Sequence, residues 1–307
     1  MIVSDTFEVL DNVRSAVTIG TFDGVHIGHQ KIIKHLVARA HSKGLKSIVL
    51  TFFPHPRMVL SKENDIELLN TIKEKSKLLE NLGIDYLIVL PFTKEFSVQS
   101  AQEFVQHILV DGLHVAHLVV GYDHRFGKNR EANVDDLIKF GTEFDFQVEQ
   151  IEAQDMAEVT ISSTKIRIAL KQGKVALAAK YLGYHYAFMG TVIHGQALGR
   201  QMGFPTANLH PDKPYKLIPH RGVYAVRVKW NNNLYPGMMN IGINPTVSDD
   251  GMSIEVHLFD FNGNLYHEEI EVQCIERLRD EIKFKDVAAL KKQLIEDKNL
   301  ALAILKK

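Results

Sequence analysis

The chain has 307 residues, of which 45% are hydrophobic and 24% charged, as expected of a globular protein with about two domains. Its 36 basic and 37 acidic residues leave no surplus of positive charge that would favour binding to nucleic acid. Cys274 is the only cysteine, which excludes intramolecular disulfides and makes a cysteine-based zinc site improbable. We expect a cytoplasmic protein that binds no membrane, because the sequence starts without a secretory signal pattern and no apolar run approaches the roughly 20 residues needed to cross a bilayer.

The first half alternates short apolar runs with helical patterns. We expect strands within residues 15–20, 46–53, 85–92, 117–122 and 146–151. Between them, apolar residues at helical spacing predict helices over 29–44, 71–83, 101–112 and 134–144, with Gly44 as the stop of the first helix. Apolar strands that alternate with helices are typical of a parallel sheet covered on both faces, so we predict a Rossmann-like α/β domain.

The second half changes to a mainly β pattern near residue 184. Alternating runs predict strands within 186–195, 222–230, 234–242, 253–261 and 265–275, and one helix from about 286 to 305. Turn signals at Asn231 to Asn233 and at Asn262-Gly263 separate several of these runs. We predict a small antiparallel β-barrel with a C-terminal helix. A helical pattern over 163–183 marks the joint, and the expected domains are 1–183 and 184–307.

The stretch TIGTFDGVHIGHQ, residues 18–30, stands where the first expected strand leads into a helix. In an open α/β sheet, ligands bind at the carboxyl ends of the strands. Glycines there let the backbone approach phosphates, and the N-terminus of a helix favours their charge. His26 and His29 can donate N–H groups to phosphate oxygens. A metal site is a weaker interpretation, because this spacing is not the i, i+4 histidine pair of a zinc-protease helix.

Seven positions match the pattern G-x-F-D-G-x-H-x-G-H, which chance would produce at about 10⁻⁹ per starting position if each residue type is used at about 5%. The segment resembles the signature of H-x-G-H nucleotidylyltransferases, and in its full form that of the bacterial bifunctional riboflavin kinase/FMN adenylyltransferase family. Three further segments resemble that family's motifs: TFFPHPR (51–57), VVGYDHRFGKNR (119–130) and ISSTKIR (161–167). His124 stands where phenylalanine is usual, and Lys165 replaces the commoner arginine. The run GQALGRQMGFPTANL (195–209) resembles the riboflavin kinase signature.

For the first half, the resemblance implies a nucleotidylyltransferase domain that transfers an adenylyl group from ATP to FMN, giving FAD and pyrophosphate. The FMN phosphate is already ionised at neutral pH, so this step needs positioning and charge neutralisation more than a base. The family motifs assign His26 and His29 as the catalytic pair that holds the ATP phosphates. Other implied phosphate-binding residues are Gly20, Phe22, Asp23, Gly24, Gly28, Ser163, Thr164 and Arg167. Asp123 and Arg125 are implied near the flavin or adenine.

For the second half, the resemblance implies phosphorylation of riboflavin by ATP. The sequence has no Walker-type phosphate loop, so glycines such as Gly195 and Gly199 are expected to cover the nucleotide. Thr206 and Asn208 would supply oxygens to Mg²⁺ and to the phosphates, as hard cations prefer. The acceptor is a neutral hydroxyl that benefits from a base, and Glu255 is the candidate. Arg279 is implied near the flavin.

Three alternatives remain to be weighed. Class I aminoacyl-tRNA synthetases share an H-I-G-H element but need a late lysine-rich loop, and the nearest string, KEKSK at 73–77, fits the solvated face of a helix. A flavin-binding regulatory protein could keep both folds without the chemistry. A single-activity enzyme could result from the departures at His124 or after Thr246, where 247–252 differ from the usual pattern. The resemblance implies riboflavin, FMN and ATP as small-molecule partners, and the sequence is silent on oligomeric state.

Overall fold

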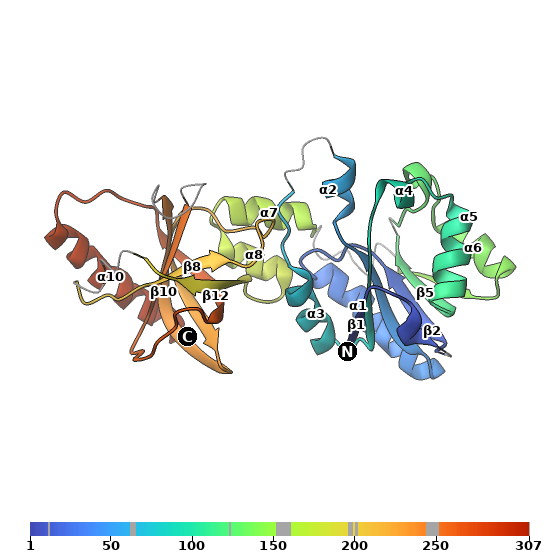
Figure 1. Ribbon diagram of the computed structural model, residues 1–307, viewed down its shortest axis with the longest axis horizontal. Helices are drawn as coiled ribbons and strands as arrows, with labels where there is room; N and C mark the ends of the chain where they lie inside the picture. Colours follow the sequence, from blue (N-terminus) through green and yellow to red (C-terminus); the bar gives the residue numbers. More distant parts are fainter. Residues whose placement is uncertain are drawn as a thin grey trace. The chain divides into compact units, whose positions relative to one another are not determined.

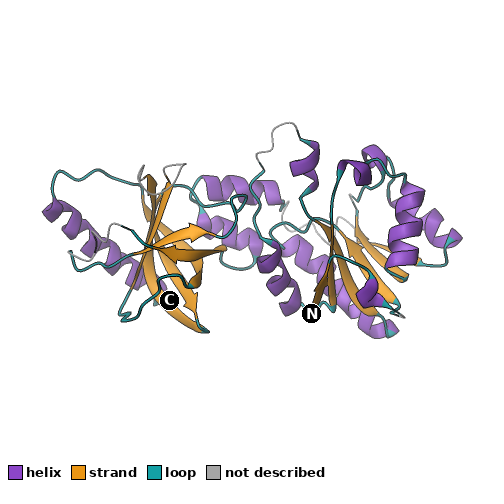
Figure 2. Cartoon of the chain, in the orientation of Figure 1, coloured by secondary structure: helices purple, strands orange, loops and turns teal. Residues whose placement is uncertain are grey.

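A computed structural model describes residues 1–11, 13–61, 66–122, 124–151, 161–195, 199, 202–243 and 252–306. The chain divides into two compact units, Met1–Ser162 and Ser163–Lys307 (Figure 1). Helices and strands alternate in the first unit, whereas strands dominate the second (Figure 2). Among the described residues, no helix is both long and apolar enough to cross a bilayer.

The first unit is built on a six-stranded sheet with the order β1-β4-β3-β2-β5-β6. Its strands are β1 (Ile2–Ser4), β2 (Ser15–Ile19), β3 (Lys46–Phe52), β4 (Tyr86–Leu90), β5 (Val115–Gly121) and β6 (Gln147–Ile151). The neighbouring strands pair in parallel. The chain proceeds from β2 outward through β3 and β4, then crosses to β5 and β6 on the other side. The strand order therefore reverses between β2 and β5, which is where open α/β sheets bind ligands.

Helices cover both faces of this sheet. They are α1 (Ile27–Lys43), α2 (Pro56–Leu60), α3 (Ile72–Asn81), α4 (Lys94–Ser97), α5 (Ala101–Phe104) and α6 (Val134–Glu143), with shorter helical segments η1 (Glu8–Leu10), η2 (Val105–Gly112) and η3 (Lys128–Arg130). Alternate residues of β2 enter different apolar clusters: Ala16 packs with α1 and α3, and Val17 with α5, η2 and α6. The predicted two-faced parallel sheet is confirmed.

The element ends follow local chemistry. Gly44 adopts a left-handed φ of 63° and its N–H reaches the carbonyls of Ala40 and His41, so the predicted stop of α1 is confirmed. The helix expected over 101–112 divides into α5 and the π-helical η2. The sequence reading missed β1, α2 and α4, which have three, five and four residues, too few to show a period.

The second unit is a closed barrel with the strand order β10-β11-β8-β7-β12-β9. Its strands are β7 (Ala187–Ile193), β8 (Ala207–Pro211), β9 (Gly222–Trp230), β10 (Asn233–Ile243), β11 (Met252–Leu258) and β12 (Glu269–Arg279). The sequence predicted five of them and missed β8. Asn231 and Asn232 have φ of 47° and 63°, as the expected turn between β9 and β10 requires. The predicted antiparallel barrel is confirmed.

Three helices accompany the barrel. The single helix expected over 163–183 is two, α7 (Ser163–Lys171) and α8 (Val175–Leu182), because Gly173 turns the chain at a φ of 72°. Both lie in the second compact unit, so the division at 183/184 stays a prediction for the functional domains. The expected C-terminal helix is α10 (Val287–Leu305), and its apolar residues pack over Phe259 and Met238 outside the barrel.

Candidate active sites

The loop between β2 and α1 has an unusual backbone. Phe22, Gly24 and Val25 have φ of 43°, 86° and 34°, and such values are rare for a phenylalanine and more so for a β-branched valine. Each such residue costs on the order of 1–3 kcal/mol and persists only where its surroundings fix it. Asp23 fixes this loop, because its carboxylate accepts hydrogen bonds from the N–H groups of Leu69 (3.0 and 3.1 Å) and Asn70 (3.2 Å). Asp23 is almost fully buried.

The two motif histidines meet at the N-terminus of α1. His26 is the N-cap, and its Nδ1 accepts a hydrogen bond from the His29 N–H at 3.3 Å. The two rings stack with centroids 3.5 Å apart and planes 17° from parallel, and Phe22 meets His29 edge-on. Since Nδ1 of His26 is an acceptor, the ring carries its proton on Nε2 in the neutral form.

Burial keeps both imidazoles uncharged near neutral pH. Desolvation lowers the pKa of His26 from 6.5 to about 4, against the attraction of the nearby Asp23 carboxylate. Desolvation also lowers the pKa of His29 well below its ordinary value, and positive charge on His26 or Lys75 would lower it further. A pair of neutral N–H donors at a helix N-terminus suits a bound anion, because donors and helix dipole then act together.

Lys75 is a buried residue beside this loop that the sequence did not reveal. The string KEKSK was placed on the solvated face of its helix, which is wrong for Glu74 and Lys75, since both are buried in α3. The Lys75 ammonium donates a hydrogen bond to the Thr21 carbonyl at 2.6 Å. Nothing in the local pattern reveals this, because alternating charged residues usually mark an exposed face.

The other motifs of the first half follow strands of the same sheet. The segment 51–57 begins at the end of β3, and His55 caps α2 by accepting the Arg57 N–H at 3.1 Å. The third motif begins at the end of β5, the neighbour of β2 in the sheet. There the His124 ring lies near-parallel to Phe126, with centroids 6.0 Å apart, and so keeps an aromatic ring where the family has phenylalanine. Arg125 is exposed, and Asp123 lies outside the described residues.

The fourth motif begins the second unit. Ser163, Thr164 and Arg167 lie in the first two turns of α7. Thr164 is exposed, whereas Ser163 and Arg167 are half-buried. Their predicted role on the ATP phosphates stays a prediction.

Strand register assembles the candidate site of the barrel. Glu255 on β11 lies directly opposite Asn208 on β8 and opposite Asn240 on β10, and directly opposed residues share a face. The Thr206 hydroxyl donates to Glu255 Oε2 at 3.1 Å. A Cβ at Gly195 would lie only 2.0 Å from the Asn208 amide nitrogen, so a larger residue there would displace the Asn208 side chain. The sequence reading named each of these residues except Asn240.

The remaining residues of the second half have mixed outcomes. Arg279 forms a two-pronged salt bridge with the buried Asp297 of α10, at 2.7–3.1 Å. This salt bridge accounts for the position of Arg279. The contact of Arg279 with flavin stays a prediction. A Cβ at Gly199 would lie 2.2 Å from the Phe204 carbonyl oxygen, which indicates a tight turn. The departure from the family pattern at 247–252 falls almost wholly outside the described residues, which resume at Met252.

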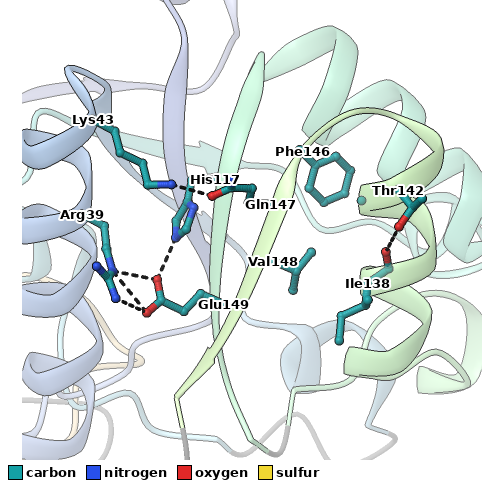
Figure 3. Close-up of a pocket in the computed structure, with 10 residues that line it drawn as sticks. Arg39, Lys43, His117, Ile138, Thr142, Phe146, Gln147, Val148 and Glu149 are labelled. Carbon is teal, nitrogen blue, oxygen red and sulfur yellow. Dashed lines mark hydrogen bonds and ion pairs between the residues drawn. The ribbon is translucent and has the colours of Figure 1, made fainter.

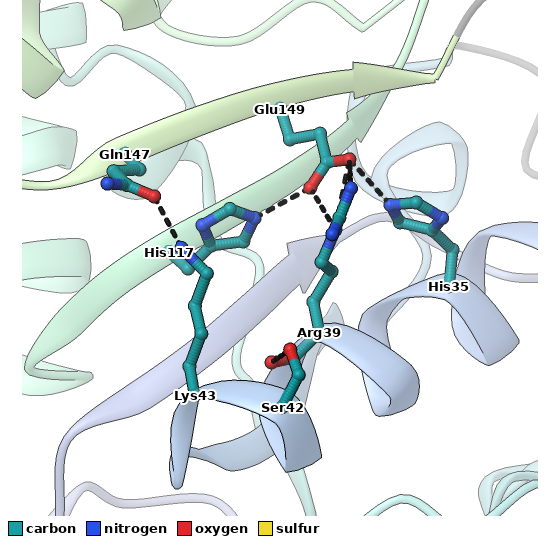
Figure 4. Close-up of polar contacts among 7 residues, drawn as sticks. All are labelled: His35, Arg39, Ser42, Lys43, His117, Gln147 and Glu149. Carbon is teal, nitrogen blue, oxygen red and sulfur yellow. Dashed lines mark hydrogen bonds and ion pairs between the residues drawn. The ribbon is translucent and has the colours of Figure 1, made fainter.

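A pocket of about 580 Å³ lies elsewhere in the first unit, between α1, β5, β6 and α6 (Figure 3). None of the predicted site residues lines it, and Arg39 is about 15 Å along α1 from His29 at 1.5 Å per residue. At its edge, Glu149 accepts hydrogen bonds from His35, Arg39 and His117 at 2.7–3.2 Å (Figure 4). Burial would raise the pKa of Glu149, but these bonds outweigh it and lower that pKa to about 2.

The described part of the chain contains no cluster of three His, Cys, Asp or Glu residues that could hold a metal ion. The barrel site instead offers the hydroxyl of Thr206, the amide of Asn208 and the carboxylate of Glu255. Oxygen donors of this kind suit Mg²⁺, which is usually bound through one or two protein oxygens together with substrate phosphates. The residues present therefore fit such an ion.

Comparisons with known proteins cover both halves of the chain. Residues 9–165 match the FAD synthetase family model and residues 182–305 the riboflavin kinase model. The chain is 42% identical to the bifunctional riboflavin kinase/FMN adenylyltransferase of Listeria monocytogenes over 93% of this chain and 91% of that protein. It is 38% identical to the Bacillus subtilis protein of that name, over 95% of this chain and 93% of that protein.

A solved structure from Streptococcus pneumoniae, titled a macrolide-efflux protein, resembles the whole chain. It has a TM-score of 0.87 and 31% identity and covers 98% of this chain and 99% of its own. The resemblance read from the sequence motifs is confirmed, and with it the prediction of a transferase in flavin cofactor synthesis. The chain belongs to the family of bifunctional riboflavin kinases/FMN adenylyltransferases.

Proposed function

We propose that this chain makes FAD from riboflavin in two ATP-dependent transfers, each assigned to one of the expected domains, 1–183 and 184–307. The barrel converts riboflavin and ATP to FMN and ADP, and the α/β unit converts FMN and ATP to FAD and pyrophosphate. The observation that carries this division is the contrast between the two sites. One presents paired neutral imidazoles at a helix N-terminus, and the other presents a carboxylate beside a hydroxyl and an amide.

The adenylyl transfer needs donors more than a base. The FMN phosphate oxygen attacks the α-phosphorus of ATP, and the bond to the pyrophosphate oxygen breaks. Neutral His26 and His29 would donate their ring N–H groups to the ATP phosphates, and the first N–H groups of α1 would add their dipole. The glycines Gly20, Gly24 and Gly28 would let the backbone approach the phosphates. Asp23 would act by fixing the loop, since backbone N–H groups already occupy its oxygens.

The phosphoryl transfer has a neutral acceptor, so it benefits from a proton acceptor. Glu255 would take the proton of the riboflavin hydroxyl as its oxygen attacks the γ-phosphorus, and ADP leaves. The hydrogen bond from Thr206 orients the carboxylate before substrate arrives. Thr206 and Asn208 would hold Mg²⁺, which supplies neutralisation of phosphate charge when bound. Gly195 lets the Asn208 side chain lie close to the backbone at this point.

The direct test is to incubate the pure protein with riboflavin, ATP and Mg²⁺ and to separate the flavins by chromatography. We expect FAD. Accumulated FMN would mean that only the barrel is active, whereas FAD made only from added FMN would mean that only the α/β unit is active. Unchanged riboflavin and unchanged FMN would indicate a flavin-binding protein without chemistry. Omission of Mg²⁺ should stop both transfers.

A further inference from the structure

Lys75 is a buried lysine that contacts the loop between β2 and α1 in the first unit. It lies in the first turn of α3 with 5% of its surface exposed, and its ammonium donates to the Thr21 carbonyl at 2.6 Å. Burying an ammonium is costly unless polar groups surround it, and lysine is among the residues least often buried. A side chain kept in such a place needs an explanation beyond the packing of α3.

The bond to Thr21 holds the start of the strained loop. The same carbonyl oxygen also accepts a hydrogen bond from the Thr51 hydroxyl of β3 at 3.3 Å. Two residues farther on, Asp23 is bound by the N–H groups of Leu69 and Asn70, which lead into α3. The segment that enters α3 therefore fastens the loop at two points. Between and after these points lie the left-handed residues at 22, 24 and 25, which need such support.

Charge is the second link between Lys75 and the loop. Two titratable groups interact electrostatically with the ammonium: Asp23 of the loop and His29 of α1. Glu74, the neighbour of Lys75 in α3, is also buried. The Glu74 carboxylate is engaged by the Thr71 N–H at 2.9 Å as part of the helix cap. Burial lowers the pKa of Lys75 to about 8, so the side chain is mostly protonated at pH 7 and repels a proton from His29.

We propose that Lys75 is a positioning residue of the adenylyl-transfer site, whose ammonium holds residues 21–25 and the paired imidazoles in the arrangement that receives the ATP phosphates. The inference rests on the proposed function of the first unit. Lys75 acts through Thr21 and His29 and needs no contact with ATP.

The first test compares Lys75→Met, Lys75→Arg and the exposed control Lys77→Met on the same helix. FAD formation from FMN and riboflavin phosphorylation are measured on each sample. We expect Lys75→Met to lower kcat for FAD formation by about 100-fold, as a misplaced site does, with phosphorylation unchanged. Lys75→Arg should recover most of the loss because it keeps the charge, and Lys77→Met should match the wild type.

The second test measures the electrostatic effect of Lys75 on His29 and does not depend on enzyme activity. Histidine ring titrations by NMR should show that Lys75→Met raises the pKa of His29, because the neighbouring positive charge is gone. The inference would be overturned if the Lys75→Met protein formed FAD at the wild-type rate and its His29 had the wild-type pKa. Wild-type protein that forms no FAD would instead refute the proposed function.

A third measurement serves if Lys75→Met does not fold. Wild-type FAD formation should fall as the pH rises through about 8, because Lys75 then loses its proton, and Lys75→Arg should keep its activity there because guanidinium stays charged. Equal alkaline decline in both proteins would contradict the role of the ammonium.

Discussion

The ring of His26 accepts a backbone hydrogen bond through Nδ1, so it can cap α1 only while that nitrogen has no proton. The same neutral ring stacks on His29, where a second positive charge would be repelled. At the scale of single residues, then, the protonation of the motif histidines links the stability of the helix end to the donors offered to phosphate. Sequence spacing identified the two rings but could not give their tautomer, which depends on the loop.

His26 should make the first unit sensitive to acid. Its pKa is near 6.5 unfolded and about 4 folded, so the unfolded state binds more protons in between and the free energy of unfolding falls as the pH drops from 6.5 to 4. The loss is about 3 kcal/mol at 1.36 kcal/mol per pKa unit. His26→Asn, which can still cap, should lack this slope in urea unfolding. The control His41→Asn should keep the wild-type dependence of the unfolding free energy on pH. If His26→Asn kept it as well, His26 would not be the group responsible.

Glu149 should affect the stability of the first unit at lower pH than His26 does. Its pKa is about 2 folded and 4.5 ordinarily, so its stabilising effect is complete above pH 4.5 and is lost as the pH falls toward 2. We expect Glu149→Gln to lower the free energy of unfolding by about 2 kcal/mol at pH 7, with a smaller difference at pH 3.5. A difference that is the same at both pH values in urea titrations would show that the charge is not responsible.

At the scale of elements, the long periodic segments of the fold could be predicted from the sequence, but contacts that tertiary packing creates could not. The helical spacing around Leu36 and the glycine stop gave α1 correctly. Strand β8 was missed because Ala207–Pro211 is short and reads as a motif, yet its pairing with β11 is what brings Asn208 to Glu255. Lys75 was misplaced because a charged residue gives no sign that its surroundings bury it.

A buried ion pair adds to the apolar packing that attaches α10 to the barrel. Asp297 is 2% exposed and binds Arg279 through two oxygens, with Gln293 also donating to it at 3.0 Å. Removing one member of a buried pair leaves an uncompensated charge, so Asp297→Asn should lower the free energy of unfolding by about 3 kcal/mol. The neighbouring Glu296→Gln, on an exposed pair of 4.0 Å, should change it by less than 1 kcal/mol. Equal effects in thermal unfolding would refute this account.

At the scale of the whole molecule, two compact units with different architectures carry two kinds of site. In the proposed function, imidazoles at a helix N-terminus would serve the acceptor that is already an anion, and a carboxylate in the barrel would serve the neutral alcohol. The family motifs imply this division, and the structure adds the hydrogen bonds of His26 and Glu255. Because the two proposed transfers use different residues, the two activities should be separable by single substitutions.

The most direct measurement follows FMN and FAD by chromatography in two variants, each supplied in turn with riboflavin or FMN together with ATP and Mg²⁺. His29→Ala should make FMN from riboflavin at the wild-type rate and form no FAD from either flavin. Glu255→Gln should bind riboflavin with roughly wild-type affinity but leave it unphosphorylated, and should still convert FMN to FAD. Loss of both activities in a folded variant of either kind would contradict the division of the two transfers between the units.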